Sequence, residues 1–363
     1  MASSLIDARV AALVARRVSG EGARPPDTYL TRRLERDLQA AVPRAEELVA
    51  RVSGIPAPPP VHWAVVGRGD WAEANITGMS TLIAPLADRL GERMESIPKA
   101  ARLVQKGFLS AEVGVMLGYI SRRVLGQYDL LVPESDPSLP KWKRARRPGG
   151  GASLYFVGSN MVESSQRMRF VPEDFSLWVA VHEVTHRFQF AGVPWLRDTF
   201  FDLVRTYLES VEMDAKSFAG RMVVAARKLV SRSTPEEERN AVYLFATEEQ
   251  RTLLDRMQAL MAVVEGHGNY VMDAVGADVI PTFRGMRDRF DKRRENTNLI
   301  QRVINNALGL EMKLRQYELG QRFCEAVASR GGNEALAHLW SDPSNLPTLE
   351  ELKTPERWVQ RVA

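Results

Sequence analysis

Two histidines four residues apart, His182 and His186, constrain this chain more than any other feature, because they lie in a strongly apolar stretch. Residues i and i+4 of an α-helix share one face, so both imidazoles can bind the same metal ion. The surrounding apolar residues predict a buried helix over about 174–190. Polar side chains buried in such a helix need partners, which a metal ion supplies. The alternative interpretation is a pair of hydrogen-bonded core histidines.

Glu183 directly follows the first histidine. It is rotated by about 100° from His182 around the helix, which places its carboxylate beside a bound metal ion rather than on it. Imidazole nitrogens combined with a carboxylate favour Zn²⁺, and catalytic zinc typically has three protein ligands and a water molecule. We therefore expect zinc as the cofactor, Glu183 as a catalytic base, and a third protein ligand elsewhere in the chain.

Glu265, His267 and Glu209 are the candidates for this third ligand. Glu265 is favoured because glycines follow it at positions 266 and 268, inside a helical pattern over about 247–275. A glycine within a helix costs about 1 kcal/mol relative to alanine. Such a cost is typical of a place where the backbone approaches another element closely, here the predicted metal helix.

The same helical pattern contains further candidates for the site. Asn269 lies one turn after the favoured ligand and can orient a metal-bound imidazole through a hydrogen bond, and Asp273 lies one turn further. The group that stabilises the oxyanion of the reaction is predicted to be His267, Tyr270 or Tyr317, and the sequence alone does not separate these three.

Strand composition is limited to a few short segments. HWAVV at 62–66 and SLYFVG at 153–158 read as strands, with RMRFV at 167–171 as a candidate partner of the second. Helical patterns dominate the rest. The sequence therefore predicts a mainly α protein, of the α+β class, with a small β-sheet beside the histidine helix.

Composition bounds the class of protein and its compartment. The chain has 363 residues, of which 45% are hydrophobic and 26% charged, as in globular proteins. A proline-rich stretch at 55–60 predicts a boundary between an N-terminal helical segment, 1–60, and a main domain, 61–363. Charged residues interrupt the apolar N-terminus, and no apolar run reaches about 18 residues. We expect a cytoplasmic protein without membrane contacts.

Charge and cysteine content exclude several kinds of site. The chain has basic runs at 141–147 and 291–296, but the net charge is only +4, from 49 basic and 45 acidic residues interleaved along the sequence. We therefore expect no nucleic-acid partner. The only cysteine, Cys324, cannot form an intramolecular disulfide or a cysteine-based zinc site. The oligomeric state cannot be predicted.

Several stretches of the chain resemble one known family. They are FSLWVAVHEVTHRFQF at 175–190, VPWLRD at 193–198, EGHGNYVMDAVG at 265–276, VLGQYDLLVP at 124–133, GLEMKLRQYELGQRF at 309–323, DWAEAN at 70–75 and LPTLEEL at 346–352. The chain resembles the bacterial zincin-like metallopeptidases, which are often labelled as associated with deazaflavin-coenzyme biosynthesis. The HExxH motif followed by a distant glutamate is similar to the arrangement in gluzincin peptidases.

This resemblance implies a helical, zincin-like fold and a zinc site. By position, His182 and His186 match the histidine ligands of the family, Glu183 matches its catalytic glutamate, and Glu265 matches the acid of its second motif. Gluzincins often have an aspartate four residues after the ligand glutamate. Here Asn269 occupies that position, and an amide orients an imidazole without adding negative charge.

The resemblance also implies an activity. It is that of a zinc-dependent hydrolase, a metallopeptidase or related amide hydrolase acting on a peptide or amide. Zincins often bind an extended substrate along an edge strand that precedes the metal helix. The segment 153–160 is therefore predicted to be the substrate strand, through Tyr155, Phe156, Val157 and Asn160. The alternative hypothesis is a zinc-stabilised scaffold or binding protein without turnover.

Overall fold

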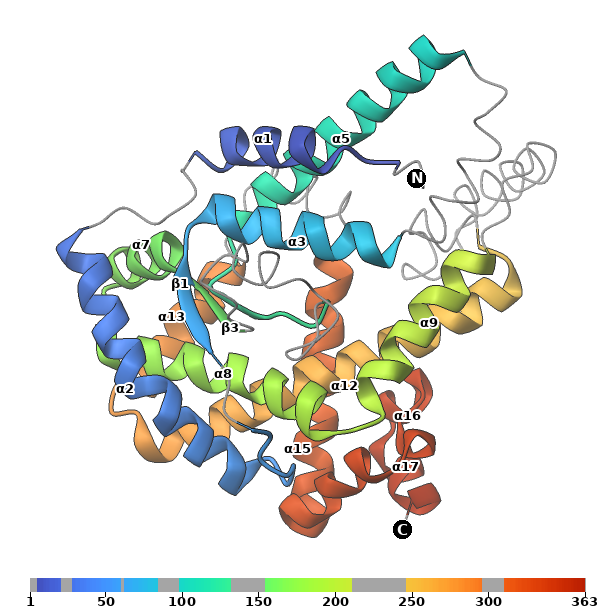
Figure 1. Ribbon diagram of the computed structural model, residues 1–363. Helices are drawn as coiled ribbons and strands as arrows, with labels where there is room; N and C mark the ends of the chain where they lie inside the picture. The colour runs from blue at the N-terminus through green and yellow to red at the C-terminus, as the bar shows by residue number, and fades with distance from the viewer. Residues whose placement is uncertain are drawn as a thin grey trace. The chain divides into compact units, whose positions relative to one another are not determined.

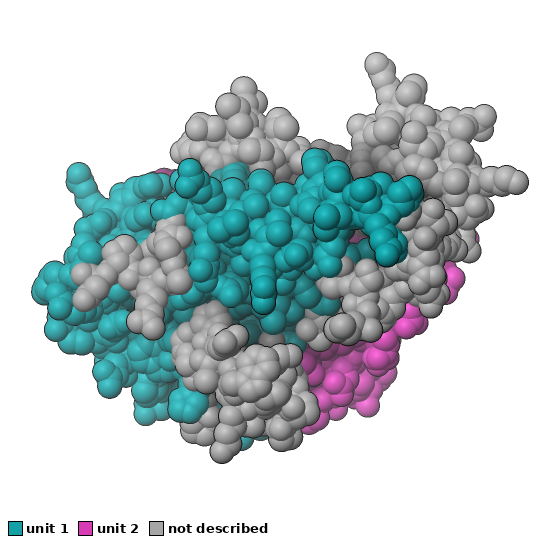
Figure 2. Space-filling model, turned by 45° about the horizontal axis from the view of Figure 1, so that its top comes forward, with its two compact units in different colours: residues 1–52, 56–192, 271–290 teal, residues 53–55, 193–270, 291–363 magenta. Residues whose placement is uncertain are grey.

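The structure is a computed structural model that describes residues 5–20, 28–59, 62–83, 98–131, 154–210, 246–295 and 310–362. The chain divides into two compact units (Figure 2). The first comprises residues 1–52, 56–192 and 271–290, and the second comprises 53–55, 193–270 and 291–363. Within the described residues, no helix has the length and apolar character needed to span a membrane.

The first unit combines helices with the small sheet (Figure 1). Its elements are α1 (Ala8–Ser19), α2 (Tyr29–Val52), β1 (Trp63–Val66), α3 (Arg68–Leu82), α5 (Lys99–Ser121), β2 (Gly126–Tyr128), β3 (Leu154–Val157), α7 (Gly158–Met168) and α8 (Pro172–Gly192), with most of α13 (Phe283–Glu295). α1 packs on α5 and α3, and α2 packs along α8. The predicted mainly α fold with a small sheet is confirmed.

The second unit is helical in its described part. Its elements are α9 (Leu196–Ser210), α15 (Leu310–Ser341), the short 3₁₀ helix η3 (Pro343–Asn345), α16 (Leu349–Lys353) and α17 (Pro355–Val362), with most of α12 (Glu248–Val279). Phe323 and Trp358 meet edge to face in its core, at 5.4 Å between ring centroids. Cys324 follows Phe323 in α15 and is fully buried, and this burial raises the pKa of its thiol, which therefore stays protonated.

The sheet has three strands in the order β1-β3-β2. β1 runs parallel to β3, with Trp63 opposite Leu154, and β2 runs antiparallel to β3, with Tyr128 opposite Leu154. All four residues of β3 are buried, as expected for a strand covered on both faces. The predicted strands at 62–66 and 153–158 are confirmed. The pairing of the second with 167–171 is wrong, because α7 extends to Met168.

The helix that carries both histidines is α8, and most of its residues are buried. Pro172 occupies its first position, where the missing N–H is not needed. Asp174, in the first turn, accepts hydrogen bonds from the Thr282 backbone N–H and hydroxyl at 3.1 and 2.5 Å, which ties the start of α8 to the segment before α13. The predicted helix over about 174–190 is confirmed.

In the second unit, α12 and α15 approach each other closely at a pair of glycines. A Cβ atom on Gly320 would lie 1.8 Å from the Ala262 carbonyl oxygen, and one on Gly266 would lie 2.1 Å from the Gly320 carbonyl carbon. The close approach predicted at Gly266 is therefore present. The element in contact with Gly266 is α15, and the prediction that it would be the metal helix is wrong.

This contact predicts a large effect of a single methyl group. We expect Gly320→Ala to destabilise the protein by roughly 3 kcal/mol, the upper end of overpacking costs, although alanine itself favours a helix by about 1 kcal/mol. Urea unfolding checks this. Gly107→Ala in α5 is the control, because nothing beyond the backbone of its own helix lies within 4 Å of a Cβ placed there. Equal stabilities of the two variants would contradict the close approach.

Candidate metal centre

The two histidines of α8 face the same point. His182 Nε2 and His186 Nε2 lie 3.1 Å apart, and both side chains are half-buried. Two nitrogen ligands at about 2.05 Å from a tetrahedral zinc ion are roughly 3.4 Å apart. The histidine pair therefore already has nearly the separation that a shared zinc ion requires.

Gln189 fixes the orientation of the second histidine. Its amide Oε1 lies 2.9 Å from His186 Nδ1, and the glutamine is fully buried. An amide oxygen can only accept, so Nδ1 carries the proton and the Nε2 lone pair points to the metal position. Gln189 was not predicted as a site residue, although its spacing of three residues from His186 is the sequence signal for this contact.

Glu183 is buried against the backbone of the sheet. It is 6% exposed, and a Cβ atom on Gly126 of β2 would lie 2.6 Å from Glu183 Cγ and 2.8 Å from Oε1. Only a glycine at this position leaves room for the carboxylate. The sheet therefore lies beside the histidine helix, as predicted, and β2 is the strand in contact with Glu183.

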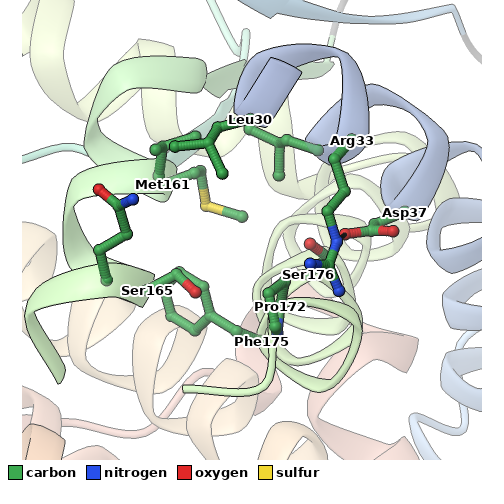
Figure 3. Close-up of a pocket in the computed structure, with 11 residues that line it drawn as sticks. Leu30, Arg33, Asp37, Met161, Ser165, Pro172, Phe175 and Ser176 are labelled. Carbon is green, nitrogen blue, oxygen red and sulfur yellow. Dashed lines mark ion pairs between the residues drawn. The ribbon is translucent and has the colours of Figure 1, made fainter. Parts of the chain in front are cut away.

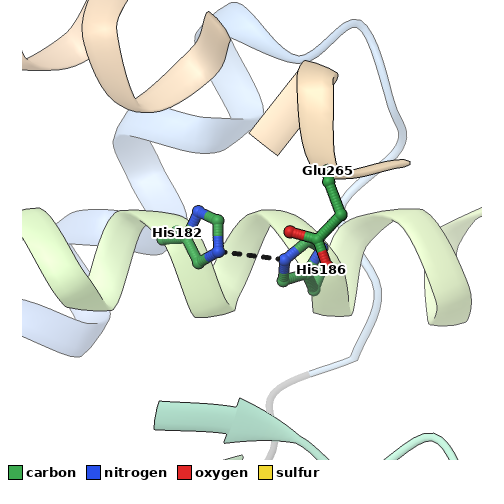
Figure 4. A group of neighbouring side chains, drawn as sticks. All are labelled: His182, His186 and Glu265. Carbon is green, nitrogen blue, oxygen red and sulfur yellow. Dashed lines mark hydrogen bonds between the residues drawn. The ribbon is translucent and has the colours of Figure 1, made fainter. Parts of the chain in front are cut away.

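Glu265 completes a group of three potential metal ligands (Figure 4). One ligand atom each from His182, His186 and Glu265 lies within 4.8 Å of the other two. This is the one such group of three or more among the described residues, and it does not include Glu209, whose side chain is exposed. Two imidazoles and a carboxylate are a ligand set that zinc prefers.

Arg187 holds the metal helix to its surroundings from inside the protein. Its side chain is 1% exposed, and Nη1 pairs with Glu46 of α2 at 2.7 Å. Nη2 donates to the carbonyl oxygens of Pro58, at 3.1 Å, and Pro59. The residue after a candidate ligand thus connects α8 to α2 and to the proline-rich stretch.

The predicted oxyanion donors lie in the packing of the second unit. His267 is fully buried, with its ring 5.0 Å from that of Trp340. The Tyr270 hydroxyl donates to Asn333 Oδ1 at 2.9 Å, and burial raises the pKa of this tyrosine. The side chain of Tyr317 lies outside the described residues, so that prediction stands untested.

Three further residues that were predicted to lie at the site, Asn269, Asp273 and Asn160, differ in their contacts. Asn269 is half-buried one turn after Glu265. Asp273 pairs with Arg287 at 3.3 Å. Asn160 has structural contacts in the first turn of α7: it donates to the carbonyl oxygens of Ser121 and Val124 and accepts from Arg68.

The prediction of an edge strand at 153–160 is wrong. Tyr155, Phe156 and Val157 belong to β3, which is the central strand and pairs with β1 on one side and β2 on the other. Its backbone groups are therefore occupied by the sheet itself. The edge strand next to Glu183 is β2, a segment of low strand propensity that sequence patterns did not identify.

The comparisons with known proteins agree with this geometry. A family model described as zincin-like metallopeptidase matches residues 6–359. A solved crystal structure from Chloroflexus aurantiacus, described as a candidate hydrolase with a novel fold, is 30% identical with a TM-score of 0.68, and the match covers 98% of each chain. A search of curated proteins finds none that is similar.

Proposed function

The chain belongs to the zincin-like metallopeptidase family, and on this basis we propose that it is a zinc-dependent hydrolase that cleaves peptide or amide bonds. The observation that carries the proposal is the grouping of His182, His186 and Glu265, with Glu183 beside it. In this proposal the two histidines and Glu265 are the protein ligands of zinc. The zinc ion supplies Lewis acidity when bound.

Glu183 is the proposed general base. Its carboxylate takes a proton from the attacking water and passes it to the leaving amine. The position supports this role, because Glu183 follows a ligand on the same helix and is held against Gly126. A purely structural zinc site has no use for a buried carboxylate beside an open coordination position.

We further propose that an extended peptide binds along β2. This strand is at the edge of the sheet, and within the described residues only β3 pairs with it. An edge strand offers unpaired backbone N–H and C=O groups to an extended chain. The contact of Gly126 with Glu183 would bring such a peptide close to the base.

Metal content tests the ligand set. We expect about one zinc per chain in the untagged protein by elemental mass spectrometry. Glu265→Ala should weaken zinc binding by at least about 100-fold, because even the outer partners of ligands contribute 10–100-fold. Glu209→Ala is the control, since it removes the exposed acid that competed with Glu265 in the sequence. A wild-type protein that takes up no zinc, or a Glu265→Ala protein that binds as the wild type does, would contradict the proposal.

A further inference from the structure

A cavity of about 50 Å³ lies in the first unit, where α2, α7 and α8 meet. Figure 3 shows Arg33 and Asp37 of α2 beside the first turns of α8, with Met161 of α7 opposite. By the same measure of volume a water molecule needs at least about 10–15 Å³. The cavity therefore has room for only a few non-hydrogen atoms.

Two polar atoms of the lining are buried without a hydrogen bond. Among the described residues, neither Asp37 Oδ2 nor Ser176 Oγ has a hydrogen-bond partner. Ser176 is only 1% exposed. Arg33 forms an ion pair with Asp37, but its Nε lies 3.9 Å from Oδ2, too far for a hydrogen bond. A carboxylate and a hydroxyl are thus both able to accept from a ligand.

The charges around the cavity favour a cation. Arg33 is shared between two carboxylates, because it donates to Glu173 at 2.6 Å and forms only a longer ion pair with Asp37, at 3.9 Å. One guanidinium therefore faces two carboxylates here, and the charge of Asp37 is only partly compensated. Burial raises its pKa, as expected for a carboxylate that lacks strong donors, while Glu173 adds to this rise and Arg33 and Arg36 oppose it.

We propose that this cavity binds the ammonium group of a small aliphatic primary amine. An ammonium has three N–H donors and a positive charge, which match the Asp37 carboxylate and the Ser176 hydroxyl. Its alkyl carbons would contact the apolar part of the lining, which includes Leu34, Met161 and Phe175. A carboxylate ligand would instead face the like charge of Asp37.

This site is distinct from the metal centre, although both use α8. Ser176 precedes His182 by six residues, which corresponds to about 9 Å along the helix axis. Asp37, Met161 and Ser176 take no part in the proposed ligand set. Amine binding in this cavity is therefore independent of the proposed hydrolase activity.

Methyl NMR on the full-length protein tests the proposal. With ¹³C-methyl-labelled methionine, and the Met161 signal assigned from Met161→Leu, n-butylammonium chloride is titrated in. We expect a saturable shift of that signal with a Kd on the order of 1 mM, since a five-atom ligand has limited binding energy. Butyrate and n-butanol at equal concentration should cause no saturable shift. Absence of saturation with the amine, or equal binding of butyrate, would overturn the proposal.

Variants separate the site from general charge effects. Asp37→Asn should weaken butylammonium binding at least about tenfold, since it removes the charged acceptor. Glu35→Gln, the same loss of charge at an exposed position of α2, should leave the Kd unchanged. Ser176→Ala provides a second variant, expected to weaken binding about threefold through one lost hydrogen bond. Unchanged binding in both Asp37→Asn and Ser176→Ala would refute the assignment.

Discussion

The Glu183→Gln variant is expected to bind zinc as the wild type does and to hydrolyse peptides about 10³-fold more slowly, within the range that a general base contributes. Glutamine has the same shape, so it keeps its place against Gly126, but an amide cannot take a proton from water. A library of quenched fluorescent peptides measures the rate, and elemental mass spectrometry measures the zinc.

Glu163→Gln is the matched control for this variant. It makes the same change in charge at a side chain of α7 that is 54% exposed, and it should leave both turnover and zinc content unchanged. Turnover in Glu183→Gln equal to that of the wild type would show that Glu183 is not the base. Full zinc content without turnover in the wild type would favour the alternative of a scaffold stabilised by zinc.

The Arg187→Met variant is expected to lose about 3 kcal/mol of stability, the lower end of the cost of breaking a buried ion pair, because the Glu46 side chain left behind is 29% exposed. Methionine fills most of the volume, but Glu46 and two proline carbonyls lose their donor. Arg187→Lys should recover only part of this stability, because a single ammonium group cannot contact both Glu46 and the two proline carbonyls as the planar guanidinium does. Urea unfolding measures each variant.

Arg205→Met provides the comparison for Arg187. Arg205 pairs with Asp202, but both side chains are exposed, at 60% and 62%. Exposed ion pairs contribute little, so we expect a change of no more than about 0.5 kcal/mol. If Arg187→Met proved no less stable than Arg205→Met, the buried arginine would not hold α8 in place.

The sequence predicted those parts of the fold and site that depend on local patterns. Helical spacing placed His182 and His186 on one face of a buried helix, and strand composition located β1 and β3. The order of the strands in the sheet could not be predicted from the sequence, because it depends on pairing between segments far apart in the chain. β3 therefore looked like an edge strand, although it lies at the centre of the sheet.

Single residues show the same limit. Gly266 was correctly predicted to mark a close approach of the backbone to another element. The presence of a glycine does not identify that element, which is α15 at Gly320. Asn160 was predicted to contact substrate, yet its amide bonds the backbone at Ser121 and Val124. Polarity alone does not reveal whether a side chain binds its own chain or a ligand.

The strand order also has a consequence for the timing of folding. The parallel pairing of β1 with β3 joins Trp63 to Leu154, and closing so long a loop costs chain entropy, so this pairing is expected to form late. Both histidines, by contrast, come from one helix, which forms from local contacts. In a newly synthesised chain, α8 should therefore bring His182 and His186 onto one face before β2 packs with Gly126 against Glu183. In the proposed hydrolase, the general base would then take its position only in the finished fold, after the two histidines.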